Sequence, residues 1–120
     1  MHLIYFINIV RKINFMTPEK KVQNKILTYL KELKENNEPI FFERRQAGGF
    51  SYKKGIPDLY AVYYGLHIEI EVKKVGGELS TMQEKFRDMC YKNNIKYICT
   101  DNVDSFINFM NEIKWKFISK

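Results

Sequence analysis

Three ionisable residues, Asp58, Glu71 and Lys73, have the types and spacing of a small catalytic group. They lie in the stretch GIPDLYAVYYGLHIEIEVKK, residues 55–74, which is otherwise rich in the aromatic and β-branched residues typical of strands. Charged side chains on a largely apolar strand cost free energy unless they are paired, hydrated or bound to a metal ion. Two carboxylates can share one Mg²⁺, and a nearby ammonium group can stabilise charge that grows on a phosphate under attack. The pattern therefore outlines a site for metal-assisted phosphodiester hydrolysis.

The same residues allow a second interpretation, a cross-strand salt bridge between Asp58 and Lys73 on a hydrated face. Alternating charge is common on exposed strands. However, Gly55 and Pro57 restrict the backbone just before Asp58, and the neighbouring residues are too apolar for a plainly hydrated edge. These two features favour the catalytic interpretation.

A β-hairpin with Gly65-Leu66 as its turn is predicted to position these groups, because glycine at the first place of a two-residue loop suits a type II′ turn. In that register Asp58 faces Lys73 and lies diagonal to Glu71, at roughly 7–8 Å between backbones. Residues i and i+2 of a strand share a face, so Glu69 lies on the same side, where we expect it to have a supporting role.

The other elements predict a single α/β domain in the order α-β-β-β-α-β with a C-terminal helix, its mixed sheet flanked by helices. Thr17, Pro18 and Glu19 form a strong helix start, with an N-cap hydroxyl, a proline at the first position and an acid in the first turn. That helix should end near residues 36–37. The other expected elements are strands at 40–46, 58–64, 67–74 and 95–100 and helices from residue 80 and from residue 101 or 102. The helix from residue 80 should bury Met82, Phe86, Met89 and Cys90.

Composition narrows the class of protein. A chain of 120 residues with 45% hydrophobic residues is long enough for one domain with a real core. Its net charge of +6 suggests an anionic partner such as nucleic acid, although evenly spread lysines can serve solubility alone. Cys90 and Cys99 form no CxxC pair, and His2 and His67 stand alone, so zinc sites and histidine-dependent triads are not expected. A reduced, cytoplasmic protein without a membrane span follows from these features.

The motif residues together resemble a known family. Pro57-Asp58 followed by Glu71-Val72-Lys73 is the pattern of the PD-(D/E)xK nuclease superfamily. The surrounding sequence segments GIPDLY, IEVKKVGGELSTMQ and EKKVQNKILTYL resemble the VRR-NUC domain, the virus-type replication–repair nuclease, over residues 19–109. The resemblance implies a restriction-endonuclease-like core and a metal-dependent endonuclease, of phage or mobile-element origin, that acts in replication, recombination or repair.

The resemblance also implies roles for individual residues. Glu19, Asp58 and Glu71 would be ligands of Mg²⁺ or Mn²⁺, Lys73 would position or activate water, and Gln83 would lie beside the site. Two of these positions have a simpler explanation. Glu19 suits the positive end of a helix dipole, and Gln83 completes a capping box that begins three residues earlier at a serine.

Four basic residues around the glycine-rich loop are candidates for DNA phosphate contacts: Arg44, Arg45, Lys53 and Lys54. They are about as well explained as hydrated surface charge. Since backbone contacts carry no sequence information, we expect selectivity for DNA structure, such as Holliday junctions or other branched DNA, and action as a homodimer. The alternative is a catalytically inactive nucleic-acid-binding module on the same fold.

The first 15 residues have two interpretations. Met16 would make an ordinary start immediately before the helix cap, so residues 1–15 would be an upstream extension of the reading frame. Alternatively they form an extra strand or helix packed on the domain of residues 16–120.

Overall fold

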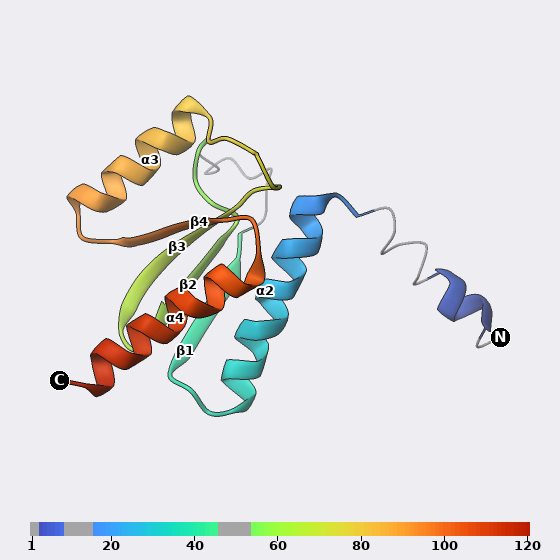
Figure 1. Cartoon of the computed structure of the whole chain (residues 1–120), viewed down its shortest axis with the longest axis horizontal. Helices are drawn as coiled ribbons and strands as arrows, with labels where there is room; N and C mark the ends of the chain where they lie inside the picture. Colours follow the sequence, from blue (N-terminus) through green and yellow to red (C-terminus); the bar gives the residue numbers. More distant parts are fainter. Residues whose placement is uncertain (1–2, 9–15, 46–53) are drawn as a thin grey trace.

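The computed structural model describes residues 3–8, 16–45 and 54–120 of the chain. Residues 3–8 form a short helix, and the elements that follow confirm the predicted order (Figure 1). In chain order they are α2 (Pro18–Glu35), β1 (Ile40–Arg44), β2 (Leu59–Tyr63), β3 (Leu66–Val72), α3 (Thr81–Lys92), β4 (Lys96–Thr100) and α4 (Val103–Ile118). Within these ranges no helix is both long and apolar enough to cross a membrane.

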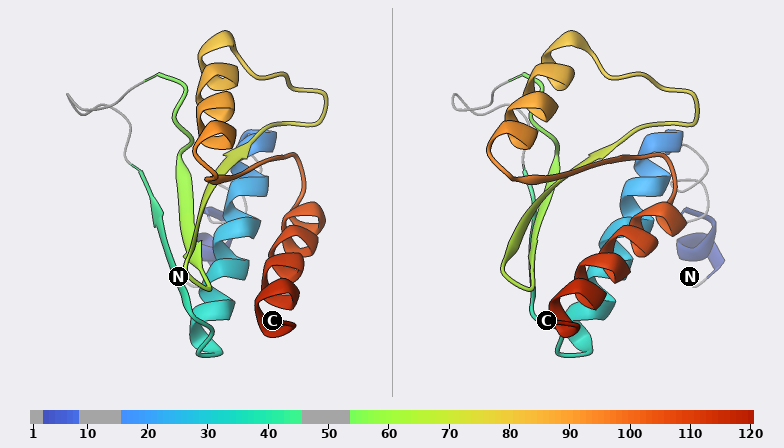
Figure 2. Two further views of the ribbon diagram at one scale, coloured as in Figure 1. Left: turned by 90° about the vertical axis from the view of Figure 1, so that its left-hand side faces the viewer. Right: turned by 60° about the vertical axis from the view of Figure 1, so that its left-hand side comes forward.

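The four strands form one mixed sheet in the order β1-β2-β3-β4. The β1–β2 and β2–β3 pairs are antiparallel, and the β3–β4 pair is parallel. Parallel neighbours need a crossover connection, and α3 supplies it between β3 and β4. Helices α2 and α4 contact each other and also contact strands of the sheet (Figure 2).

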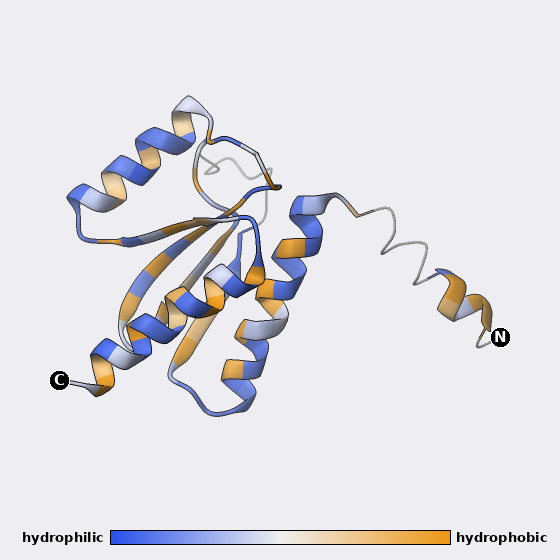
Figure 3. Cartoon of the chain, viewed as in Figure 1, coloured by the Kyte–Doolittle hydropathy of each residue, from blue (hydrophilic) through white to orange (hydrophobic). Residues whose placement is uncertain are grey.

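The main core lies between the sheet and the α2–α4 pair. Ile68 and Ile70 of β3 pack there against Ile26 of α2 and Phe106 of α4, all of them almost fully buried. Figure 3 shows hydrophobic and hydrophilic residues alternating along both helices, as expected when each buries one face. Successive residues of a strand point to opposite faces, so Glu69 and Glu71 point away from this core.

The opposite face of the sheet is covered by α3 near β4. Tyr97 of β4 makes an edge-to-face contact with Tyr91 of α3, and it pairs across the sheet with Glu69. The prediction for α3 was partly wrong, because Met82 and Met89 are 45% and 40% exposed and only Cys90 is fully buried. The reason is that α3 packs at the β4 edge and does not span the whole sheet.

The hairpin turn is Tyr64-Gly65, and the predicted turn at Gly65-Leu66 is wrong. Both turn residues have positive φ, 49° and 79°, as a type I′ turn requires. Tyr64 accepts this conformation because its ring packs against Phe117 of α4 at 4.6 Å and its hydroxyl donates to Glu38.

The change of turn shifts the strand register by two residues. Tyr63 pairs with Leu66, and Leu59 pairs with Ile70. A shift of two leaves every side chain on its predicted face, so the shared face of the acidic residues is retained. However, one step beyond the last pair Asp58 now lies opposite Glu71, where the predicted register made them diagonal neighbours and placed Asp58 opposite Lys73.

Candidate active site

A pocket of about 130 Å³ lies where the first turn of α2 meets the open end of the β2–β3 hairpin. The start of β2 and the end of β3 are neighbours there because the two strands are antiparallel. The pocket brings together three of the predicted site residues, Glu19, Asp58 and Glu71. Its full lining is Thr17, Glu19, Lys20, Gln23, Asp58, Ile70, Glu71 and Val72.

Asp58 and Glu71 differ in exposure, although both line the pocket. Glu71 is the next-to-last residue of β3, is only 7% exposed, and has one carboxylate oxygen, Oε1, buried without a hydrogen-bond partner. Asp58 immediately precedes β2 and has an exposed side chain. Its main chain is held by the Arg45 N–H, which donates to the Asp58 carbonyl oxygen at 2.6 Å.

The pocket disfavours the charged form of the Glu71 carboxylate. Burial raises the pKa of Glu71 from 4.5 to about 7. The ammonium group of Lys73 opposes this rise, whereas the carboxylates of Asp58 and Glu19 add to it. A cation in the pocket would relieve both the desolvation of Glu71 and its repulsion from the other two acids.

The donor set fits a hard divalent ion. Three carboxylates around one pocket, one with an unpartnered buried oxygen, are the oxygen ligands that Mg²⁺ and Mn²⁺ prefer. Across residues 3–8, 16–45 and 54–120, no three His, Cys, Asp or Glu side chains are yet arranged so that they could hold a metal ion. Glu19 and Asp58 are exposed, so their side chains have room to rotate toward an ion in the pocket.

Lys73 lies one residue beyond β3 and is half-buried. Its N–H donates to the carbonyl oxygen of Thr100 at 2.9 Å, and its side chain lines a neighbouring depression together with Cys99 and Thr100. It is close enough to lower the pKa of Glu71. In the described part of the chain it forms no ion pair with Asp58, so the salt-bridge alternative is not what the structure contains.

Gln83 has the capping role that its sequence context suggested. Its Oε1 accepts from the Ser80 N–H at 2.8 Å, and its own N–H donates to the Ser80 hydroxyl at 3.2 Å. The first turn of α3 is also pressed against Gly55, three residues before Asp58. A Cβ atom at Gly55 would lie 2.4 Å from the Met82 carbonyl oxygen and 3.1 Å from the Gln83 nitrogen.

The basic residues proposed for DNA contact are in different environments. Arg44 ends β1 and is exposed, and Lys54 is also exposed. Arg45 instead directs its guanidinium to Glu69 and to the Pro57 carbonyl oxygen. A phosphate contact by Arg45 would have to compete with these bonds. Lys53 lies outside the described residues.

One pocket residue, Gln23 on α2, was missed by the sequence analysis. It is 6% exposed, and its Oε1 is buried without a partner. The sequence did contain a signal, because residue 23 shares its helical spacing with the buried Ile26 and Leu30 and follows Glu19 by four positions. A polar side chain at a buried position of a helix, one turn from a candidate metal ligand, indicates a residue that faces the site.

Comparison with known proteins supports the fold. A solved structure of a VRR_NUC domain matches this chain with a TM-score of 0.63 and 18% sequence identity, over 78% of this chain and 97% of that chain. At this identity the likeness shows the fold alone, and it confirms at that level both the resemblance and the restriction-endonuclease-like core. No protein-family model matches the sequence, and no curated protein matches it.

Proposed function

We propose that this protein is a Mg²⁺- or Mn²⁺-dependent endonuclease that hydrolyses phosphodiester bonds in DNA. The observation that carries the proposal is the convergence of Glu19, Asp58 and Glu71 on one pocket, within the fold of a VRR_NUC domain. The unpartnered oxygen and the raised pKa of Glu71 support it, because a buried carboxylate in such a setting is better explained as a ligand than as a structural group.

The site residues would have different roles according to their chemistry. Glu19, Asp58 and Glu71 would hold the ion, which when bound supplies Lewis-acid polarisation of a phosphate oxygen. The ammonium group of Lys73 would orient the attacking water and stabilise negative charge that develops on the phosphate. Gln83, fixed by its capping bonds, would complete the edge of the site nearest Gly55.

Cleavage of DNA with and without the metal ion tests the proposal. Purified protein should cut one or more members of a panel of linear, nicked, flapped, single-stranded and four-way-junction DNAs with Mg²⁺ or Mn²⁺, and a chelator should abolish cutting. Asp58→Asn and Glu71→Gln should weaken metal binding and lose most of the rate, by about 10²-fold or more. Lys73→Ala should lose the rate and keep metal affinity. Lys74→Ala, its exposed neighbour, is the matched control and should keep both.

Two results would contradict the proposal. Full cleavage by the Glu71→Gln variant would remove Glu71 from the site. Binding of the whole DNA panel without any cleavage, in the presence of either ion, would instead identify an inactive nucleic-acid-binding module.

We further propose a preference for branched DNA and action as a homodimer in replication, recombination or repair, in the cytoplasm of a bacterial cell if the gene is carried by a phage. The support is the net charge of +6 and the exposed Arg44 and Lys54, which suit backbone contacts that carry no sequence information. A two-fold dimer would present two sites at a fixed spacing, which suits a symmetric junction. Paired symmetric nicks in a four-way junction by a species of dimeric mass would support this. A monomer that cuts only flaps or ends would contradict it and leave the nuclease assignment intact.

A further inference from the structure

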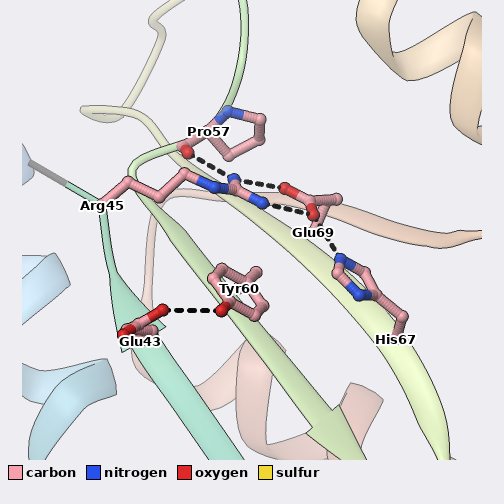
Figure 4. A network of polar contacts seen from close by, with 6 residues as sticks. All are labelled: Glu43, Arg45, Pro57, Tyr60, His67 and Glu69. Carbon is pink, nitrogen blue, oxygen red and sulfur yellow. Dashed lines mark hydrogen bonds and ion pairs between the residues drawn. The ribbon is translucent and has the colours of Figure 1, made fainter. Parts of the chain in front are cut away.

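A network of side chains connects β1, the segment before β2, and β3 on the sheet face where Glu69 lies (Figure 4). Its centre is a two-pronged ion pair. Arg45 Nη1 donates to Glu69 Oε1 at 2.6 Å, and Nη2 donates to Oε2 at 2.8 Å. His67 Nε2 also contacts Glu69 Oε2, and the His67 ring stacks on the Tyr60 ring at 5.3 Å.

The same arginine holds the two backbone carbonyl groups that flank the Cα atom of Asp58. Its main-chain N–H donates to the Asp58 carbonyl oxygen at 2.6 Å, and Nη1 donates to the Pro57 carbonyl oxygen at 2.8 Å. The guanidinium carbon lies 4.6 Å from the centre of the Tyr60 ring, which limits its movement further. The position of the Asp58 main chain is therefore coupled to the position of the Arg45 side chain.

Glu69, the partner of Arg45, is held firmly in the sheet. Its side chain is only 4% exposed, and its main chain pairs with Tyr60 of β2 on one side and Tyr97 of β4 on the other. Glu71 follows Glu69 by two residues on the same strand, so the two carboxylates share a face. Contacts thus run from the Asp58 backbone through Arg45 and Glu69 into the strand that carries Glu71.

We infer that the Arg45–Glu69 ion pair is a positioning device that sets the separation between the Asp58 and Glu71 carboxylates. The inference rests on the proposed function, because the separation matters only if the two acids share a ligand. Two carboxylates repel, and Asp58 lies one residue outside the last β2–β3 pair, so its separation from Glu71 depends on the contacts that hold its backbone. Outer groups that orient metal ligands typically affect metal affinity by about 10- to 100-fold.

Glu69→Gln is the principal test because it keeps the shape of the side chain and removes the charge that holds Arg45. In the metal-free full chain, hydrogen exchange of the Arg45 main-chain amide should accelerate at least about tenfold, because this N–H donates to the Asp58 carbonyl oxygen. In calorimetric titration with Mn²⁺, affinity should fall about tenfold or more. Arg45→Lys keeps a positive charge but loses the two-pronged geometry, so it should give smaller changes in the same directions and covers the case in which Glu69→Gln does not fold.

Lys114→Met is the matched control. Lys114 forms an ion pair with the partly buried Glu38 at 2.5 Å, and neither residue lines the pocket. This variant should lower thermal stability, as loss of the Arg45–Glu69 pair also would, and leave Mn²⁺ affinity and Arg45 amide exchange unchanged.

The outcomes separate this inference from the proposed function. If the wild type binds Mn²⁺ and Glu69→Gln and Arg45→Lys bind it equally well, the positioning role is overturned and the nuclease proposal survives. A wild type that binds no divalent ion would overturn both. An equal loss of Mn²⁺ affinity in Lys114→Met would reduce the effect to general destabilisation and would also overturn the positioning role.

Discussion

Glu71 is the residue whose environment most constrains what the pocket can do. The folded protein holds a proton on Glu71 up to a pKa of about 7, whereas the unfolded chain releases it near 4.5. Between these values the folded state binds more protons than the unfolded state, so this group makes stability fall as pH rises. The charged carboxylate is therefore a cost in the metal-free protein at neutral pH.

We accordingly predict that Glu71→Gln is more stable than the wild type above the folded pKa when no metal is present. One pKa unit corresponds to about 1.4 kcal/mol, so the gain has an upper limit of roughly 3 kcal/mol near pH 8. It should shrink as pH falls and vanish below the unfolded value of 4.5. Urea denaturation at several pH values with a chelator present measures it, and a gain that does not change with pH would contradict the assigned cause.

Gln23 gives a second test at this scale. A buried polar atom without a partner costs about 1–3 kcal/mol, so Gln23→Met should leave the free energy of unfolding unchanged or raise it by about 1 kcal/mol. If the side chain serves the site, cleavage should nevertheless fall several-fold. Thermal melts and cleavage rates check the two parts, with Lys31→Met, an exposed position on the same helix, as the control. Loss of stability with unchanged cleavage would assign Gln23 to the core.

The candidate site was partly predictable because strand alternation fixes which side chains share a face. Asp58 and Glu71 could be placed together from spacing alone, and the two-residue register error left that conclusion unchanged. The ion pair that Arg45 forms with Glu69 could not be predicted in the same way. Glu69 lies 24 residues away from Arg45, on β3, and the two come together only because β1 pairs with β2 and β2 pairs with β3.

At the scale of elements, the helices were well predicted because their caps are local. Thr17, Ser80 and Asn102 each accept a hydrogen bond from the first turn of the helix that they begin. The hairpin turn was not well predicted, because Tyr64 adopts positive φ through packing against Phe117. That contact joins residues far apart in the chain, so no local pattern reveals it.

The close approach of α3 to the segment before Asp58 makes a prediction at this scale. Gly55 has φ of +92°, and a Cβ atom there would collide with the Met82 carbonyl oxygen at 2.4 Å. Gly55→Ala should therefore lower the free energy of unfolding by about 2 kcal/mol or more and reduce cleavage by moving Asp58. Gly65→Ala is the control, because its φ is also positive but no atom lies within 4 Å. Equal effects of the two substitutions in denaturant unfolding would show that conformation alone, without the contact, explains the loss.

At the scale of the whole molecule, the packed domain draws its core from residues 22–113. The helix at residues 3–8 contributes no buried residue to it, and Leu3, Tyr5 and Phe6 are all more than 60% exposed. We therefore expect a chain shortened to residues 16–120 to keep its melting temperature within about 2 °C and to keep its cleavage rate. If the shortened chain folds but does not cleave DNA, residues 1–15 complete the site or a contact between subunits.

The β2–β3 hairpin also has a consequence for the order in which the protein folds. Its strands are joined by two residues, so its pairing has the lowest entropy cost of loop closure in the sheet, whereas the β3–β4 pairing must close a longer loop that contains α3. Asp58 and Glu71 sit at the open end of that hairpin and are brought together as it closes. Their mutual repulsion would then be felt before the core is complete, and it would slow closure of the last pairs. If Asp58 and Glu71 hold a divalent ion, that ion would affect the folding rate as well as the stability of the folded domain.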